Sequence, residues 1–581
     1  MALSARSTYS KNEATTWPIP NYWDIFALLL VFGLIIALAW SAKQMIAPFH
    51  VGESITISLE PKYLPMYAAR TVLRLFIALF FSLVFTFVVG AWAAKNKYAE
   101  RLIIPSIDIL QSVPIYSFFT ITISGFILLF QNSMLGPECA SIFLVFTSQV
   151  WNMTLSFYQG VKTLPNDLRE AADVFHLTSW QRFWKVEVPF SMEGLLWNMM
   201  MSMSGSWFYV TASEALTISN QNITLPGIGS YIALAITQAN TYAILYAIIT
   251  MLLVIFLYDQ LLFRPLAHWV DRFKEEQDED IKRPPAWLVS LFQRARLVHR
   301  FGDLFLILAD FIVNFSPRAK KTPVIKPAKE KKAFLYWSSI YYFALGIFLL
   351  GMAILIIHFI ITSTNLAEVR HVIMLGIYTG IRVITLIFIS SLLWVPIGVF
   401  IGLRPRVAAV IQPIVQFLAA FPANLLFPIV AFLVIHYHLN VEIWVAPLMV
   451  LGTQWYILFN VIAGASALPK ELKLVAANLR VRGWLWWRRL ILPGIAPYFI
   501  TGAITAAGGA WNASILAEVI SWGAIKLEAT GLGAYIARYS AQGDFTRVVL
   551  GTLIMCMMVL VINRLFWRPM YNLAVKRFQA E

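Results

Sequence analysis

The chain has 581 residues, of which 59% are hydrophobic and only 13% are charged. Soluble domains carry roughly 25% charged residues, so this composition excludes an ordinary soluble protein and indicates a chain that crosses a membrane repeatedly. The formal net charge is +15, but Lys and Arg form short clusters between apolar runs, as in cytoplasmic loops, so we expect no nucleic-acid partner. Cys139 and Cys556 are the only cysteines, which excludes a disulfide framework or a cysteine-rich metal site.

Apolar runs long enough to cross a hydrocarbon core of roughly 30 Å follow one another along the chain. Six are expected in the first half, at residues 23–42, 67–93, 104–130, 141–160, 192–217 and 241–263. Six more are expected at 336–361, 375–402, 411–436, 442–463, 496–521 and 546–566. The first run lacks an early small-residue cleavage pattern, which predicts a retained span. We therefore predict an all-α membrane protein with about twelve transmembrane helices.

The basic residues predict how these spans are oriented. With the N-terminus inside, the predicted cytoplasmic loops hold Lys95, Lys97 and Arg101 and then the basic residues of 162–185, whereas segment 218–239 outside has neither Lys nor Arg. The second half repeats this asymmetry. The positive-inside rule therefore predicts a multi-pass membrane protein with both termini in the cytoplasm. We expect the membrane to be the bacterial inner membrane.

The two sets of spans repeat one another. Four residues of the first half recur 308 positions later: Arg74, Gly90, Pro105 and Pro114 return as Arg382, Gly398, Pro413 and Pro422. Others recur 304 positions later, including Trp207, Glu214 and Tyr231 as Trp511, Glu518 and Tyr535. Both sets begin and end on the same side, which predicts parallel repeats with a path between them. The expected domains are a tail (1–22), a first repeat (23–266), a linker (267–333), a second repeat (334–571) and a tail (572–581).

The linker joins the repeats on the cytoplasmic side. Its acidic run at 275–280 and its basic, proline-bearing run at 317–332 are typical of a solvated segment. Residues 287–315 are rich in aromatics and leucine but are interrupted by charged residues, which predicts one or two interfacial helices. A thirteenth span would instead invert the second half and place its basic loops outside.

A basic, amphipathic loop separates the fourth and fifth spans of each half. It begins at Leu164-Pro165 and ends at Val188-Pro189, and it returns 304 residues later between Leu468-Pro469 and Leu492-Pro493. Asp167 and Glu170 lie near the start of a predicted helix, with Arg182 and Lys185 toward its end. This order of charges complements the helix macrodipole and predicts a short, stable helix.

Two interpretations of this loop are open on its residues alone. Small Ala171 and Ala172 beside exposed aromatics would allow the helix to seat in a groove on a soluble partner; the aromatics are Phe175, Trp180 and Phe183. Alternatively, it is an interfacial helix whose Trp and Arg side chains hold lipid headgroups. The cluster of Trp484, Trp486 and Trp487 in the second copy suits this alternative.

The spacing of Glu170-Ala171-Ala172, of the position six residues after the Glu, and of Val186, Val188 and Pro189 resembles the EAA loop of binding-protein-dependent ABC importer permeases. The chain is similar to two such permeases fused in tandem, over both six-span units. The stretches Trp455-Tyr456-Ile457-Leu458-Phe459-Asn460 and Gly509-Ala510-Trp511 resemble the nitrate, sulfonate, taurine and bicarbonate branch. The resemblance implies a type I ABC importer-like fold and two ATPase-coupling loops. Their residues would be Glu170, Ala171, Ala172, His176 and Pro189 in the first, and Leu474, Val475, Ala476, Arg480 and Pro493 in the second.

Both loops depart from the family pattern. The family glycine is His176 in the first copy and Arg480 in the second, and Leu474-Val475-Ala476 stands where Glu-Ala-Ala is expected. The second loop is therefore degenerate, and equal engagement of the two halves is in doubt.

No G-x-x-x-x-G-K-[ST] sequence occurs in the chain, which therefore lacks the loop that cradles nucleotide phosphates. We expect a permease that is not an enzyme and binds no cofactor itself. The resemblance implies two ABC ATPase domains on separate chains, which bind ATP and Mg, and a possible extracytoplasmic solute-binding protein. The solute is expected to be small and anionic.

Several residues are candidates for the pore or a gate. Glu214 and Glu518 lie at equivalent places in the fifth spans, where burying a carboxylate in lipid costs roughly 2.5–3.5 kcal/mol, so they should face protein or water. They either line a cavity near Trp207 and Trp511 or cap the loops that follow the helices. Pro114 and Pro422 are expected to bend the third spans and line the path. Arg74 and Arg382 either attract an anion or snorkel to the surface.

One other class of transporter competes with the permease interpretation. A secondary active transporter of the major facilitator type also joins two parallel six-span halves, but it would lack the long loop between spans four and five. Its usual Gly/Asp/Arg-rich signature after the second span is missing here. His436 and His438 alternate at an outer span end, and we interpret them as part of a solvated turn, so no metal site is expected.

Overall fold

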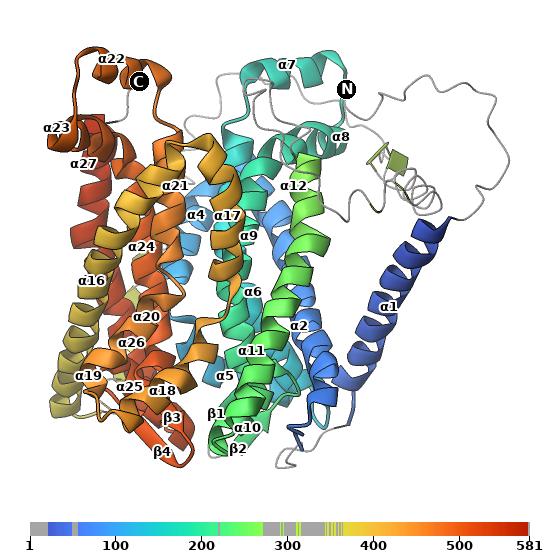
Figure 1. Ribbon diagram of the computed structural model, residues 1–581, viewed down its shortest axis with the longest axis vertical. Coiled ribbons are helices and arrows are strands. Elements are labelled where there is room, and N and C mark those ends of the chain that lie inside the picture. Colours follow the sequence, from blue (N-terminus) through green and yellow to red (C-terminus); the bar gives the residue numbers. More distant parts are fainter. Residues whose placement is uncertain are drawn as a thin grey trace.

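The computed structural model describes residues 21–48, 56–218, 221–270 and 364–578, together with scattered residues between 291 and 362. Long helices lie side by side in these ranges, with short helices at one end and two small hairpins at the other (Figure 1). The predicted all-α membrane fold is confirmed. The N-terminal tail, most of the linker with its expected interfacial helices, and most of the span expected at 336–361 lie outside the described residues.

The first half contains the helices expected from its apolar runs. They are α1 (Tyr22–Met45), α2 (Leu64–Phe85), the π-helical turn η2 (Thr86–Gly90), α3 (Ala91–Lys95), α4 (Lys97–Ser112), α5 (Ile115–Leu129), α6 (Leu135–Lys162), α7 (Asn166–Val174), α8 (Ser179–Arg182), the π-helical turn η3 (Phe183–Glu187), α9 (Val188–Ser213), β1 (Ala215–Ile218), β2 (Gln221–Thr224), α10 (Ile228–Thr237), α11 (Thr241–Tyr258), the π-helical turn η4 (Asp259–Phe263) and α12 (Arg264–Val270). A short 3-10 turn, η1 (Pro61–Tyr63), precedes α2.

The second half repeats this order. Its elements are α16 (Leu366–Gly402), α17 (Pro405–Ala420), the 3-10 turn η6 (Ala423–Leu426), α18 (Phe427–His436), α19 (Val441–Trp444), α20 (Ala446–Leu451), α21 (Trp455–Ser466), α22 (Lys470–Asn478), α23 (Gly483–Trp486), the π-helical turn η7 (Trp487–Ile491), α24 (Leu492–Ala517), β3 (Val519–Trp522), β4 (Ile525–Glu528), α25 (Leu532–Gln542), α26 (Phe545–Ile562), the π-helical turn η8 (Asn563–Trp567) and α27 (Arg568–Phe578). Residues 572–578 of the expected C-terminal tail are thus helical.

Length and apolar composition qualify six helices of the described residues as membrane spans, or eight if each of two bent pairs is one span. The sequence predicts about twelve. Part of the difference lies in α6 and α9, which have 28 and 26 residues but are less apolar. These two helices pack closely against each other, and their buried faces carry Ser, Thr and Gln side chains. A span surrounded by other helices needs less hydrophobic surface than one that faces lipid.

Two β-hairpins follow the fifth spans, where the sequence analysis expected the helices to continue to residues 217 and 521. Strands β1 and β2 pair with Ala215 opposite Thr224, and β3 and β4 pair with Val519 opposite Glu528. The segment Val519–Trp522 contains β-branched and aromatic residues, which favour strands. Gly523 has φ of +59° at the turn, a conformation that glycine adopts without strain.

Each half has its own hydrophobic core, but the third spans cross between them. Leu425 of the second half packs in the core of the first half, among Tyr67, Trp207 and Tyr231. Conversely, Ile115 and Ile123 of α5 pack in the core of the second half. The two repeats therefore form one interlocked bundle.

The third spans break at the predicted prolines. α4 ends at Ser112 and α5 begins after Pro114, while α17 ends at Ala420 and η6 begins after Pro422. Helix axes on the two sides of the second break differ by 70°. The predicted bend at Pro422 is confirmed, and the first-half span is interrupted at Pro114 as expected. That the two prolines line the path stays a prediction.

Backbone groups freed at each break are satisfied by the fifth span of the other half. The Ile115 N–H donates to Asn512 Oδ1 of α24 at 2.6 Å. The Ser204 hydroxyl of α9 donates to the Ala419 carbonyl oxygen in the last turn of α17. An unsatisfied backbone group in the membrane interior costs several kcal/mol, so these bonds join the halves where each span is interrupted.

We predict that Asn512→Leu destabilises the fold by about 1–3 kcal/mol, because the buried Ile115 N–H loses its acceptor. Thermal unfolding of the purified protein in detergent measures the effect. Thr501→Ala on the same helix is the control, because the exposed Thr501 hydroxyl bonds only the Pro497 carbonyl of its own helix at 2.9 Å. Equal unfolding temperatures for the two variants would contradict the capping role.

Candidate functional site

Helices α7 and α22 stand at the same end of the two halves, away from the hairpins (Figure 1). Both begin directly after a proline, Pro165 or Pro469. Ala172 and Ala476 are buried, at 2% and 9% exposure, whereas Glu170 and Leu474 are exposed. Each helix therefore rests on the bundle through one small residue and presents its remaining surface outward.

The sequence analysis predicted a single helix carrying Asp167, Glu170, Arg182 and Lys185, and this is wrong. α7 ends at Val174, and after a turn a second helical segment begins at Ser179 with a capping box formed by Thr178 and Gln181. Arg182 and Lys185 belong to that second segment, which leads into the fifth span. The cap competes with the charge pattern, since a Thr–Gln pair at this spacing starts a new helix.

The second segment is continuous with the fifth span. α23, η7 and α24 form one helix from Gly483 to Ala517, 35 residues long, and α8, η3 and α9 follow one another in the same way. Pro189 and Pro493 are the second residues of α9 and α24, directly after the π-helical turns. At 1.5 Å per residue the helix Gly483–Ala517 is roughly 52 Å long, so it connects the turn after α22 to the hairpin β3–β4.

His176 and Arg480 occupy the position where the EAA pattern has glycine, and both adopt a left-handed backbone, with φ of 49° and 50°. Each closes its helix in a Schellman motif. The Leu177 N–H donates to the Ala172 carbonyl at 3.1 Å, and the Val481 N–H donates to the Ala476 carbonyl at 2.9 Å. A left-handed backbone at this position costs a residue that has a side chain roughly 1–2 kcal/mol relative to glycine.

Ion pairs anchor the first of these loops. Lys95 pairs with the buried Glu187 at 2.7 Å, and Arg182 pairs with Asp173 at 3.4 Å. Glu100 accepts from Lys162 at 2.7 Å and from the Tyr158 hydroxyl at 2.5 Å, and these bonds lower the pKa of its carboxyl. The second half has apolar or small residues at the matching positions: Leu403, Ile491, Trp486, Ala477, Ala408, Ser466 and Ile462.

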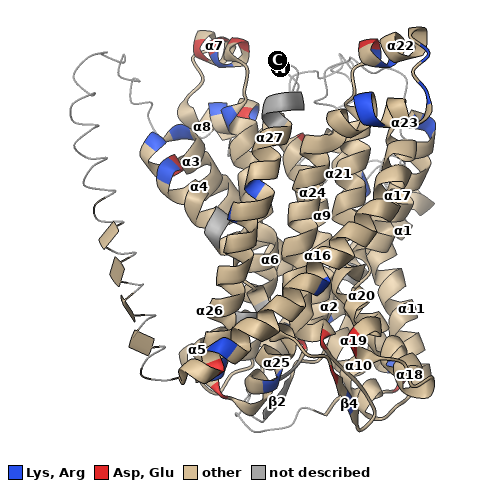
Figure 2. Ribbon diagram, turned by 90° about the vertical axis from the view of Figure 1, so that its left-hand side faces the viewer, with Lys and Arg blue, Asp and Glu red and all other residues tan. Residues whose placement is uncertain are grey.

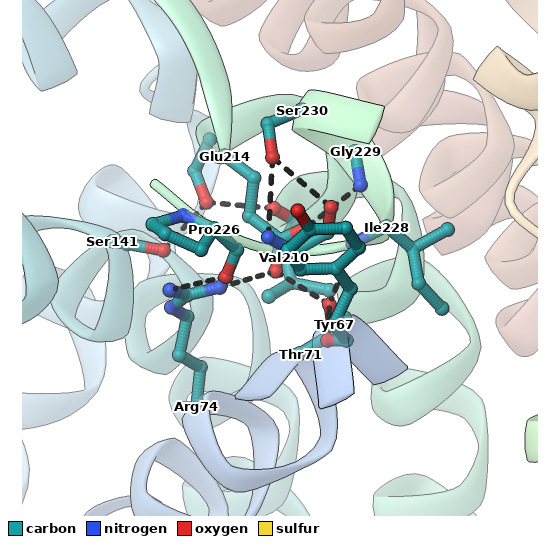
Figure 3. Close-up of polar contacts among 12 residues, drawn as sticks. Tyr67, Thr71, Arg74, Ser141, Val210, Glu214, Pro226, Ile228, Gly229 and Ser230 are labelled. Atoms are coloured by element: carbon teal, nitrogen blue, oxygen red, sulfur yellow. Dashed lines mark hydrogen bonds and ion pairs between the residues drawn. The ribbon is translucent and has the colours of Figure 1, made fainter. Parts of the chain in front are cut away.

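The candidate gate residue Glu214 ends α9 in a fully buried charge cluster at the hairpin end of the bundle (Figure 3). Arg74 donates to Glu214 at 2.6 Å and to both oxygens of Glu138 at 2.6 and 2.8 Å. Thr71 donates to Glu214 at 2.7 Å, and Glu214 accepts the Gly229 N–H at 2.7 Å. The cluster joins α2, α6, α9 and the start of α10.

The second half contains the same cluster in a more open form. Glu518 accepts from Thr379 at 2.8 Å, from Arg382 at 3.0 Å and from the Ala534 N–H at 3.1 Å. Arg382 also pairs with Glu442. The Arg382 side chain is 15% exposed and that of Glu442 is 43% exposed, whereas Arg74 and Glu138 are fully buried.

The family described as the binding-protein-dependent transport system inner membrane component matches residues 86–262 and 394–568, together more than half of the chain. The chain belongs to this family, in two tandem copies. Because these are ABC transporter permeases, the major facilitator alternative has no support.

The permease has distant relatives among proteins of known role. It is 26% identical over 176 residues to the bicarbonate transport system permease protein CmpB of Synechococcus elongatus, a match that covers 30% of this chain and about 60% of that protein. It is 25% identical over 215 residues to the glycine betaine transport system permease protein OpuAB of Bacillus subtilis, covering 37% and 69%. It is 26% identical over 145 residues to the nitrate import permease protein NrtB of Leptolyngbya laminosa, covering 25% and 47%.

The two charge clusters contain residues and contacts that the sequence analysis did not predict. Neither expectation for Arg74 holds, because its fully buried guanidinium pairs with Glu138 and Glu214 and so reaches neither the membrane surface nor a solute anion. The roles of Thr71 and Glu138 were not predicted. A signal existed, since Thr71 and Glu138 recur as Thr379 and Glu442 at the same two offsets as the rest of the repeat.

The glycines after the hairpins are needed for space. Gly227 and Gly531 have an extended backbone, with φ of −176° and −171°, which any residue adopts. A Cβ at Gly227 would lie 2.2 Å from Glu214 Cδ, and one at Gly531 would lie 2.2 Å from a carboxylate oxygen of Glu518. The backbone thus passes directly over each carboxylate.

The other candidates occupy the packed interior of each half. Trp207 is 1% exposed and lies against Tyr258, with ring centroids 5.6 Å apart, and Trp511 is 2% exposed and faces Gly380. Among the described residues, no group of three or more His, Cys, Asp or Glu side chains is placed to hold a metal ion. His436 stacks on Phe432, with centroids 5.5 Å apart.

Replacing the buried arginine is expected to be more harmful in the first half. Arg74→Met leaves Glu138 and Glu214 both buried without their cation, at a cost of about 3–5 kcal/mol. Arg382→Met leaves one buried carboxylate, Glu518, because its other partner, Glu442, is 43% exposed to water. Folded yield and unfolding temperature in detergent should fall more for Arg74→Met. Adding Glu138→Gln to that variant should recover part of the loss. Equal losses in the two halves would contradict this difference.

Glycine should be the better residue at the left-handed position. His176→Gly is expected to stabilise α7 by about 1 kcal/mol, which slows hydrogen exchange of its amides roughly fivefold. Ala171→Gly, within the helix, should speed exchange by a similar factor. Faster exchange in His176→Gly would show that the imidazole makes a contact worth more than the strain.

Proposed function

We propose that this permease forms the translocation path of an ATP-driven importer and that α7 and α22 are the contacts through which separate ATPase subunits drive it. The observation that carries the proposal is the continuous helix leading from each coupling-helix turn into the fifth span. A push on α7 or α22 reaches the outer clusters through this helix, because Glu214 and Glu518 end α9 and α24.

The interlocked third spans support coupled motion of the two halves. Each fifth span caps the break in the opposite third span, so a rigid shift of one half displaces the bend in the other. At the outer end, the Gly523 N–H in the second hairpin donates to the Ile236 carbonyl of α10 at 2.9 Å. This bond joins the halves across the outer mouth and would have to break when the path opens outward.

In this proposal, α7 and α22 lie on the cytoplasmic side of the membrane. Lys and Arg gather at the end that carries α3, α7, α8, α22 and α23 (Figure 2). By the positive-inside rule this end faces the cytoplasm and the hairpin end faces outward. An extracytoplasmic solute-binding protein would then deliver solute at the hairpins, and both termini would be cytoplasmic.

The solute is a small anion in this proposal, and the support comes from relatives named for bicarbonate and nitrate transport. The buried carboxylates Glu214 and Glu518 are held by arginines and backbone N–H groups and so stay away from the solute. ATP hydrolysis would occur on the partner subunits, where ATP and Mg bind, and the permease would contribute no catalytic residue.

Transport in proteoliposomes that contain the complex tests this proposal, with labelled bicarbonate and nitrate as probes. Uptake should require ATP, stop with vanadate and persist with an uncoupler. Glu170→Lys should lower the ATP-driven rate about tenfold or more, because charge reversal at a docking contact weakens association. Glu60→Lys, the same change at an exposed outer position, is the control. Uptake that an uncoupler abolishes would overturn the proposal.

A further inference from the structure

The two coupling helices carry opposite net charge. Residues 166–178, which contain α7 and its closing turn, hold one basic residue and the acidic residues Asp167, Glu170 and Asp173, so their formal charge is −2. Residues 470–482, which contain α22 and its turn, hold four basic residues and the single acid Glu471, so their formal charge is +3. Both segments stand at the end that would face ATPases.

The outward surfaces also differ in polarity at matching positions. Glu170 of α7 is replaced by Leu474, which is 63% exposed, and Ala171 is replaced by the larger Val475, which is 52% exposed. At the turn, His176 becomes Arg480. α22 thus presents an apolar ridge with cations at its end, where α7 presents a carboxylate and small residues.

Their attachments to the bundle differ in the same sense. The first loop is fixed by pairs of Arg182 with Asp173 and of Lys95 with Glu187, whereas the matching residues of the second loop cannot form ion pairs. Where the first loop has the buried Glu187, the second loop has the buried, apolar Ile491. The difference therefore extends from the surface of the loop to its base.

One kind of groove cannot complement both helices well. A groove with a basic or hydrogen-bond-donating group for Glu170 would leave that group unpaired against Leu474 and close to Arg480. A dry, apolar groove that fits Leu474 would bury the Glu170 carboxylate without a partner, which is costly. Discrimination between partners commonly rests on such mismatches.

We propose that α7 and α22 dock on two different ATPase chains, one with a basic groove for α7 and one with an apolar, acid-rimmed groove for α22. This inference rests on the proposed function, because it assigns the two partners of the same coupling site. The permease would then form an asymmetric complex with one copy of each ATPase.

Site-specific crosslinking in the native membrane tests this assignment. A photoreactive benzoyl-phenylalanine replaces either Phe175 or Leu479, which are 304 positions apart and 67% and 70% exposed. The captured chains are identified by mass spectrometry, with a G-x-x-x-x-G-K-[ST] sequence as the criterion for an ATPase. The same residue at Tyr242, exposed at the outer end, is the control position.

The expected result is a different ATPase sequence at each position and a single copy of each in the purified complex. In addition, Glu170→Leu should lower capture at position 175 about tenfold and leave capture at position 479 unchanged. One ATPase sequence at both positions, or a Glu170→Leu effect of equal size at both, would overturn the inference while keeping the proposed function. Capture of no ATPase at either position would overturn both.

Discussion

An arginine between two carboxylates is the constraint on which the hairpin end of each half depends. Arg74 lies where neither lipid nor water can stabilise a charge at low cost, so its two carboxylate partners must be present with it, whereas its counterpart Arg382 is partly exposed. The second, fourth and fifth spans meet at these residues, and the backbone after each hairpin closes over the carboxylates Glu214 and Glu518. Packing of the outer half of the bundle follows from satisfying these ions.

The opposite requirement operates where prolines interrupt the third spans and leave backbone groups without hydrogen-bond partners in their own helix. Asn512 and Ser204 satisfy those groups from the other half, so the breaks stabilise the contact between repeats. Ion pairs in the charge clusters hold the helices within each half together, whereas the hydrogen bonds at the breaks join one half to the other. Rigid units joined by a few directional bonds are suited to switching between discrete arrangements.

Much of this architecture can be predicted from the sequence, because spans, repeats and proline breaks depend on composition and spacing. Pro114 and Pro422 break their spans wherever the rest of the chain lies, since the missing N–H is a local property. The partners of Arg74 could not be derived that way, because which acids reach it depends on how three helices meet. The hairpins were missed because their strands are four residues long and directly continue apolar helices. The charges from Asp167 to Lys185 predict one helix, but the capping box of Thr178 and Gln181 starts a second one after the end of α7.

The joining of both repeats in one polypeptide has a consequence for how the two sides of the path can change. In a symmetric dimer, any substitution appears twice, so a residue must suit both sides of the axis at once. Here Asn512 caps a break on one side while the equivalent position holds Phe208, and Ser204 does so on the other while its equivalent is Gly508. Because both repeats lie in one chain, equivalent positions can carry different residues, and the two sides of the path can evolve separately.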